Sequence, residues 1–370
     1  MTHRADVDVS ILINTFEKPR HLALSLESIA LQQAGGVGLE VVVSDDGSDD
    51  DTARVVTEAA GRLPYPVRFT AQPHDGFRLA RVRNNAARLA TGRYLLFLDG
   101  DCILPRGHVA AFLARRRPGA AQLCYCARLP ESTSARLAPG TLDGIDLDAL
   151  APAAELRLLR RRWRKAWWHD VLRHPTKPRL AGGNFGVWKT DFERINGFDE
   201  RFVGWGQEDD DLGLRLRATG VRLESILDLT RSLHVWHPVD PTATRRWRDG
   251  ANVGYFERRG RLAACRLGLV ERVTEDLTWG LPADSRETTL GRAVLREIAG
   301  GRTMPTAGPC EIELVTRPGR GRFHRPAECR LVLAEPEARV EPSLERQADR
   351  VARVAPDDAA FLRAVLGQIG

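Results

Sequence analysis

Short apolar runs alternate with amphipathic spans along the first hundred residues of the chain. The apolar runs are VSILIN (9–14), LEVVVS (39–44), VRFTAQ (67–72) and YLLFLDGD (94–101). The spans between them have the apolar period of helices and cover residues 21–32, 51–62 and 79–90. Strands that alternate with helices in this way are typical of an α/β fold built on a parallel sheet.

Three of these predicted strands end in polar side chains. In an open parallel sheet, ligands bind beyond the carboxyl ends of the strands. We therefore expect one ligand site to be lined by the residues at these ends. They are, in chain order, Asn14 and Thr15, Asp45 and Asp46, and Asp99 and Asp101.

The pattern changes after residue 129. Residues 130–152 are rich in Gly, Pro, Ser and Asp and are predicted to form a loop. The basic segment ELRLLRRRWRKAWWHDVLRHP that follows is predicted to be a helix, because its apolar residues share one helical face. The residues of that face are Leu156, Leu159, Trp163, Trp167 and Val171.

The last hundred residues carry weaker patterns. We expect a helix at about 290–298, a hairpin formed by EIELVT and CRLVLA around a basic, Gly-rich loop, and a final helix over 344–369. Residues 1–245 are predicted to form the main domain, with a helical insertion at about 130–178. Residues 246–370 are predicted to form a C-terminal extension.

Composition narrows the class of protein. The net charge of +6 suits an anionic partner, which a nucleotide phosphate, a nucleic acid or a membrane surface would each satisfy. Six cysteines without a CxxC pair predict reduced thiols and no structural zinc. We expect a cytoplasmic protein, because no apolar run has the length of a signal-peptide core or a transmembrane helix.

Two motifs contain residues that suit a metal ion. Asp99 and Asp101, separated by a glycine at a strand end, offer hard oxygen ligands to Mg²⁺ or Mn²⁺ carrying a diphosphate, although Asp-Gly is also a common turn. His234 and His237, in LHVWHP, follow another short apolar run. They would complete the metal site from across the crevice, or else are structural or solvated histidines.

The stretch GWGQEDDD crowds four acids into a basic protein. Acids at the start of a helix cap its free amides and favour its dipole, which explains one or two of the four. Crowded carboxylates also raise one another's proton affinity, which can keep one of them as a base in a cleft. Trp205, between two glycines, offers a flat apolar face to a sugar ring or is buried in the core.

Several motifs occur in a characteristic order between residues 7 and 238. They are VSILINTFEKP, VVVSDDGSDD, GFRLARVRNNAARLATGRYLLFLDGDC, LAGGNFGVWKTDFERINGFDERFVGWGQEDDDLGLRL and LHVWHP. The series closely resembles the nucleotide-sugar glycosyltransferases of family 2. The GWGQEDDD block is also similar to the acceptor-site motif of animal β-galactosyltransferases and bacterial chondroitin-type polymerases. This implies an α/β fold with a GT-A type, Rossmann-like nucleotide-sugar-binding sheet, a helical insertion and a small C-terminal α+β extension.

The resemblance assigns roles to individual residues. The second acid of DDGS, here Asp46, would bind the uracil. Asp209 would be the catalytic base, paired with Glu208, and Asp101 would bind Mn²⁺ or Mg²⁺ together with Asp99 and with His234 or His237. The residues implied in nucleotide-sugar binding are Asn14, Thr15, Glu17, Asp46, Arg78, Arg81, Arg83, Asp99, Gly182, Gly183 and Asn184. Those implied in acceptor binding are Trp205, Gly206 and Asp210.

The implied function is a metal-dependent, inverting glycosyltransferase that moves a sugar from a UDP-sugar to a saccharide or glycolipid acceptor in bacterial surface polysaccharide or lipopolysaccharide synthesis. No nucleic-acid partner is expected. A sugar nucleotidyltransferase would need a Gly-rich, lysine-bearing loop after the first strand, and NTFEKPRHL lacks one. The alternative is a non-catalytic membrane- or anion-binding protein that uses the basic Trp-rich helix. That helix packs on the domain, covers the acceptor cleft or contacts the inner face of a membrane.

Overall fold

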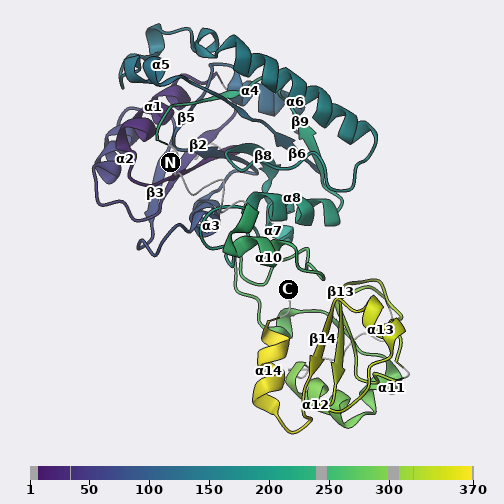
Figure 1. Ribbon diagram of the computed structural model, residues 1–370. Helices are drawn as coiled ribbons and strands as arrows, with labels where there is room; N and C mark the ends of the chain where they lie inside the picture. The colour runs from purple at the N-terminus through teal and green to yellow at the C-terminus, as the bar shows by residue number, and fades with distance from the viewer. Residues whose placement is uncertain (1–6, 34, 239–247, 299–307, 320, 369–370) are drawn as a thin grey trace. The chain divides into compact units, whose positions relative to one another are not determined.

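The computed structural model describes residues 7–33, 35–238, 248–298, 308–319 and 321–368 (Figure 1). The chain divides into two compact units, Met1–Phe256 and Glu257–Gly370. The first unit contains a seven-stranded and a three-stranded sheet, and the second contains a four-stranded sheet. The domain boundary expected between residues 245 and 246 lies outside the described residues.

The seven-stranded sheet is mostly parallel and has the strand order β3-β2-β1-β4-β8-β6-β9. Strand β8 runs antiparallel to both of its neighbours, whereas the other neighbouring pairs are parallel. The strands are β1 (Val9–Thr15), β2 (Leu39–Asp45), β3 (Val67–Ala71), β4 (Tyr94–Asp99), β6 (Ala120–Leu123), β8 (Asn184–Trp188) and β9 (Arg222–Ser225). The predicted α/β fold with a parallel-rich central sheet is confirmed.

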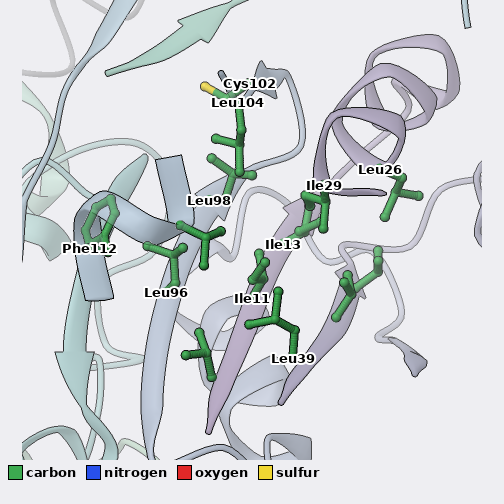
Figure 2. Packing of buried hydrophobic residues seen from close by; sticks show 14 of the residues in the cluster. Ile11, Ile13, Leu26, Ile29, Leu39, Leu96, Leu98, Cys102, Leu104 and Phe112 are labelled. Atoms are coloured by element: carbon green, nitrogen blue, oxygen red, sulfur yellow. The ribbon is translucent and has the colours of Figure 1, made fainter. Parts of the chain in front are cut away.

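Helices bury both faces of this sheet, which explains why its strands read as continuous apolar runs. On one face, Ile11 and Ile13 of β1 pack with Leu96 of β4 and with Leu26 of α1 (Figure 2). On the other face, the ring of Phe97 stacks on Phe185 at a centroid distance of 4.5 Å. The helices of this part are α1 (Pro19–Ala30), α2 (Thr52–Ala60), α3 (Leu79–Leu89) and α4 (His108–Arg115), close to their predicted spans where the sequence predicted them.

The strand order changes direction at β1, because the chain adds β2 and β3 on one side of it and β4 on the other. The register aligns Asn14 with Asp99 and Thr15 with Asp45, so the polar strand ends share one edge. Because β8 runs the opposite way, its first residue, Asn184, pairs with Leu98 at this same edge. The segment before β8 therefore reaches the crevice where ligands bind in such sheets.

The prediction of a loop at 130–152 is partly wrong. This segment contains α5 (Glu131–Arg136) and two short 3₁₀ helices, Leu142–Gly144 and Leu147–Leu150. The physical reason is burial, because Leu142 and Leu147 lie in one apolar cluster with Leu159 of the next helix. In a segment rich in Gly, Pro and Ser, these isolated leucines form no periodic apolar pattern, so the sequence did not indicate that they are buried.

The basic segment forms the expected helix, α6 (Ala153–Val171), which contacts β9 and β7. Its predicted apolar face packs on the unit only in part. Leu159 is buried, but Trp167 and Val171 of the same face are exposed at 47% and 51%. The first unit also contains α7 (Lys189–Arg194), α8 (Glu208–Ala218), α10 (Ala251–Phe256) and the three-stranded sheet of β5 (Cys102–Ile103), β7 (Cys126–Arg128) and β10 (Ser232–His234).

The predicted hairpin in the C-terminal unit is wrong. Strands β12 (Cys310–Val315) and β13 (Ala327–Ala334) are neighbours but run parallel, so the basic segment between them is a crossover. The predicted final helix is also wrong, because β14 (Arg350–Arg353) pairs with β13 inside its span. Asp358 then caps a separate helix by accepting a hydrogen bond from the Phe361 amide.

The remaining elements of the second unit surround its four-stranded sheet, whose order is β11-β12-β13-β14. They are β11 (Trp279–Gly280), α11 (Ala283–Arg286), α12 (Thr289–Ile298), α13 (Pro342–Gln347) and α14 (Ala359–Gly367). The helix expected near residues 290–298 corresponds to α12. All six cysteines of the chain are free thiols. Within the described ranges, no helix combines the length and the apolar character needed to cross a bilayer.

Candidate active site

A cavity of about 500 Å³ opens at the carboxyl edge of β1 and β4. Predicted residues from five separate parts of the sequence meet in its wall. These are Asn14, Thr15, Asp46, Asp99, Asp101, Trp205, His234 and His237. The sheet register explains this convergence, because the side chains at the ends of β1 and β4 project past the same edge.

Asp101, His234 and His237 form a group that suits a divalent cation. One ligand atom of each residue lies within 4.8 Å of the others. The antiparallel pairing of β10 with β5 sets His234 opposite Cys102, which places this histidine beside the DGD motif. Burial alone would raise the pKa of Asp101, but His237, His234 and Lys18 outweigh it and hold the pKa below its usual range. One carboxylate with two imidazoles is a donor set that fits Mn²⁺.

Asp99 was also predicted to bind the metal, but the structure does not bring it into this group. Its Oδ1 accepts a hydrogen bond of 3.0 Å from Nη2 of Arg83 instead. Arg83 is only 2% exposed and also donates to Oδ1 of Asp209 at 2.7 Å and to Oδ1 of Asn14 at 3.3 Å. This one buried guanidinium therefore joins the ends of β1 and β4 to the acidic start of α8.

The acids of GWGQEDDD lie in the first turn of α8, where they face the positive end of the helix dipole. They do not cap the helix, because the N-cap residue is Gln207 and no side-chain cap is formed. Each aspartate has its own arginine instead. The pairs are Asp209 with Arg83 at 2.7 Å, Asp210 with Arg179 at 3.2 Å, and Asp211 with Arg215 at 2.6 Å.

These aspartate–arginine ion pairs explain why a basic protein has four acidic residues in one helical turn. The pair of Asp211 and Arg215 is fully buried, and Nη1 of Arg215 also donates to the carbonyl oxygens of Ile195 and Gly197. This pair anchors α8 to the chain before it. Asp210 is 5% exposed, and its burial raises the pKa to about 6. Of the three aspartates, Asp209 alone lies beside the strand ends.

Glu208 and Asp209 have different environments although they are neighbours. The side chain of Glu208 is 7% exposed, and burial together with the nearby Asp209 raises its pKa to about 8. The side chain of Asp209 is 27% exposed. Burial also raises the pKa of Asp209, but Arg83 and the Gly182 amide at 2.8 Å oppose the rise. At neutral pH, Glu208 is therefore mostly protonated, while Asp209 is the more exposed of the two carboxyl groups, and Arg83 and the Gly182 amide favour its ionised form.

Gly182 and Gly183 bring the backbone directly against two carboxylates. A Cβ atom at Gly182 would overlap Oδ1 of Asp209, and one at Gly183 would overlap Oδ2 of Asp99. The side chain of Asn184, by contrast, is buried and bonded to His108. The structure therefore brings the two glycines to the site but leaves Asn184 outside the cavity wall.

Several other predicted residues also lie outside the cavity wall. Glu17 and Arg81 are exposed, and the side chain of Arg78 pairs with Asp75. The Arg78 backbone amide, however, donates to Oδ2 of Asp46 at 3.2 Å. The second oxygen of Asp46 accepts from Gln72, and burial raises the pKa of Asp46. Gly206 and Asp210 are buried beside the site and do not line the cavity.

Sequence reasoning did not single out several residues of the cavity wall, among them Phe16, Lys18 and Phe77. Phe16 stacks on His74 with a centroid distance of 4.3 Å, which makes a flat wall beside Asp46. Lys18 donates to Oδ2 of Asp101 at 3.0 Å. For Phe16 and Lys18, the available signal was their position directly after the first strand, in TFEK, since this loop begins at the carboxyl edge of β1.

Comparisons with known proteins agree with these features. Residues 10–143 match glycosyl transferase family 2, and residues 173–238 match the N-terminal domain of galactosyltransferase. The chain is 31% identical over 234 residues to validoxylamine A glucosyltransferase of Streptomyces hygroscopicus subsp. limoneus, covering 58% of this chain and 48% of that protein. It is 24% identical over 245 residues to chondroitin synthase of Escherichia coli, covering 59% and 33%.

A similar solved structure is a mannosyltransferase of Pyrobaculum calidifontis in complex with GDP-mannose and Mn²⁺. It has a TM-score of 0.46 and 21% identity, with coverage of 67% of this chain and 61% of that one. The chain spans about half the length of the validoxylamine A glucosyltransferases that it matches.

Proposed function

We propose that this chain, whose residues 10–143 match glycosyl transferase family 2, transfers a sugar from a UDP-sugar to a saccharide acceptor with inversion at the anomeric carbon. The observation that carries the proposal is the convergence at one sheet edge. Three features meet there. They are a cavity with a flat aromatic wall, a group of one carboxylate and two histidines in that wall, and an accessible carboxyl group at the start of α8. These are the parts needed to hold a nucleotide, its diphosphate and an attacking hydroxyl group.

The donor half of the site is supported by the ends of β1, β2 and β4. Phe16 and Phe77 offer apolar surface to a base, and Asp46 lies in the same wall to accept a hydrogen bond from the uracil imide. Asp101, His234 and His237 would hold Mn²⁺ or Mg²⁺. When bound, the ion would neutralise the charge that develops on the leaving diphosphate.

The acceptor half of the site is supported by the start of α8. Asp209 would take the proton from the acceptor hydroxyl as its oxygen attacks the anomeric carbon from the face opposite the nucleotide. Arg83 and the Gly182 amide hold the Asp209 carboxylate in place. Trp205, which is 37% exposed in the cavity wall, would stack on the acceptor ring. The likeness to bacterial chondroitin synthase supports a saccharide acceptor and a role in surface polysaccharide synthesis.

Asp101→Ala is the variant that tests the metal site. We expect it to weaken Mn²⁺-dependent UDP binding by about 100-fold or more, because a bound ion contributes several kcal/mol and each 1.4 kcal/mol is a factor of ten. A panel of nucleotide sugars should be scored by Mn²⁺-dependent thermal stabilisation and by slow donor hydrolysis. Wild type should respond to one UDP-sugar selectively, and the variant should not.

Asp143→Ala provides the matched control, because Asp143 is 81% exposed and pairs with Arg106 at the surface. It should respond like wild type. If no nucleotide sugar stabilises the wild-type protein with or without Mn²⁺, the proposed activity is wrong. If Asp101→Ala binds UDP as tightly as wild type in Mn²⁺, the metal site is misplaced.

We also propose that the C-terminal half of α6 contacts an anionic membrane surface. Trp167 and Trp168 are 47% and 55% exposed, and Leu172, directly after the helix, is 71% exposed. The same helix carries a set of exposed basic residues for which the described part of the chain supplies no ion-pair partner. They are Arg157, Arg160, Arg161, Arg164 and Lys165. Tryptophan beside unpaired basic residues is typical of helices that bind the lipid headgroup region.

The double substitution Trp167→Ser with Trp168→Ser tests this contact. Wild type should sediment with vesicles of phosphatidylglycerol and phosphatidylcholine, less so at high salt, and not with phosphatidylcholine alone. The variant should bind the mixed vesicles at least about tenfold more weakly, because it loses the burial of two tryptophan rings at the lipid interface. It keeps only the attraction of the basic residues, which is roughly 1 kcal/mol each. Leu229→Ser, which alters an exposed apolar residue elsewhere, should have no effect. Wild type that ignores anionic vesicles would refute the contact.

A further inference from the structure

Lys18 places a positive charge inside the group of metal-binding atoms. Its Nζ lies 3.0 Å from Oδ2 of Asp101 and 3.0 Å from Nε2 of His237, and these two acceptor atoms are themselves 3.2 Å apart. Lys18 is the residue before Pro19, which begins α1, so its backbone is fixed by the start of that helix. The ammonium group therefore contacts two of the three side chains that would bind a divalent cation.

The tautomer of His237 allows Nε2 to accept a hydrogen bond from Lys18 and also allows it to coordinate a cation. Nδ1 lies 2.8 Å from the carbonyl oxygen of Pro238, which can only accept, so Nδ1 carries the proton. In this tautomer the Nε2 lone pair accepts from the Lys18 ammonium group, which also donates to Oδ2 of Asp101. A histidine that donates its other ring nitrogen to a backbone carbonyl is the arrangement found in metal sites. Lys18 is thus bonded to atoms that are already prepared to coordinate a cation.

We infer that Lys18 is a displaceable cation that makes metal binding depend on the nucleotide. This inference rests on the proposed function of the same site. Lys18 must leave Asp101 and His237 before a divalent ion can bind there, because like charges cannot share these ligand atoms without strong repulsion. Its side chain is 34% exposed and lines the cavity, so it is free to turn toward a diphosphate.

The consequence is a positive coupling between metal and nucleotide. Without nucleotide, displacing Lys18 removes its anionic partner and supplies no replacement, so the metal binds weakly. With a nucleoside diphosphate present, Lys18 regains a partner in the phosphate oxygens, and the same metal site binds more tightly. By linkage, the metal strengthens nucleotide binding by the same factor.

The test is a titration of Mn²⁺ alone into wild type, Lys18→Met, Lys18→Arg and Asp101→Ala, with free Mn²⁺ measured by electron paramagnetic resonance. The titrations are then repeated at saturating UDP. Lys18→Met should bind Mn²⁺ about tenfold or more tightly than wild type without UDP, and UDP should improve its affinity less. Lys18→Arg, which keeps the charge, should stay close to wild type. Lys177→Met is the control lysine and should match wild type.

The outcomes separate this inference from the proposed function. Equal Mn²⁺ affinity of wild type and Lys18→Met without UDP would overturn the displacement by Lys18 while leaving the metal site intact. If Asp101→Ala bound Mn²⁺ as tightly as wild type, the metal site itself would be wrong. Failure of wild type to bind Mn²⁺ even with UDP, while Lys18→Met binds it, would mean that Lys18 permanently replaces the metal, which also overturns the inference. Thermal unfolding of each variant verifies that it is folded.

Discussion

Asp209→Asn should lower the rate of sugar transfer by about 10²–10⁴-fold, which is the range that a positioned general base contributes. Its carboxylate is the accessible member of the acidic pair, and an amide of the same shape cannot take a proton. The amide oxygen can keep the hydrogen bond that Arg83 donates to Oδ1, whereas the bond that the Gly182 amide donates to Oδ2 is lost, because a side-chain NH₂ group cannot accept it. The residues proposed to bind UDP are unchanged in this variant. Calorimetry should therefore show UDP binding close to that of wild type.

The pH dependence of the wild-type rate checks the same assignment. Burial raises the pKa of Asp209 above its ordinary value, so transfer should be lost as the pH falls through that raised pKa. Glu208→Gln should cost far less than Asp209→Asn, because Glu208 is mostly protonated at neutral pH. Asp143→Asn, an exposed aspartate, controls for the chemical change. A rate for Asp209→Asn within tenfold of wild type would rule out its role as the base.

Arg83→Met should reduce the free energy of unfolding by about 3–5 kcal/mol, the usual cost of removing one partner from a buried ion pair. The guanidinium is 2% exposed and bonds to both Asp99 and Asp209, so its loss leaves two carboxylates without their cation. Urea denaturation of wild type and variant measures the difference. The variant should also lose transfer activity, because Asp209 is no longer held toward the strand ends.

The sign of the pH effect follows from the same carboxylates. Burial already raises the pKa of Asp209 and Arg83 opposes the rise, so without Arg83 the folded-state pKa of Asp209 should lie further above that of the unfolded chain. The destabilisation should be complete above this raised folded pKa and disappear as the pH falls below the unfolded one. Arg81→Met alters an exposed arginine on the same helix and should change stability by no more than about 0.5 kcal/mol. An equally small loss for Arg83→Met would contradict the bridging role.

The position of the site was predictable because it depends on strand direction. A parallel sheet brings the ends of its strands to one edge, so Asn14, Asp46 and Asp99 were expected to converge without knowledge of any side-chain contact. Backbone topology, which repeats among α/β proteins, carried this prediction. The histidines of LHVWHP followed instead from the family resemblance and from their pairing with DGD, because His234 belongs to β10 of the separate three-stranded sheet.

The features that could not be predicted are the orientation of individual side chains and the direction in which two strands pair. Neither is determined by the order of residues along the chain. The sequence does not distinguish Arg78, Arg81 and Arg83 from one another. Only the packing of α3 on β1 and β2 turns the side chain of Arg83 inward. Asn184 bonds to His108, which is distant in sequence. The parallel pairing of β12 and β13 was missed because two apolar strands separated by a short basic segment favour a hairpin locally.

The pairing of acids with arginines in α8 also affects how fast an anionic ligand arrives. Three aspartates of the first turn are neutralised by their own guanidinium groups, and Glu208 is mostly protonated, so this turn adds little negative field beyond its immediate neighbours. The excess positive charge of the chain then acts at long range without local opposition from these acids. Diffusional encounter with a phosphate-bearing molecule is thereby accelerated, and the association rate constant falls as ionic strength rises.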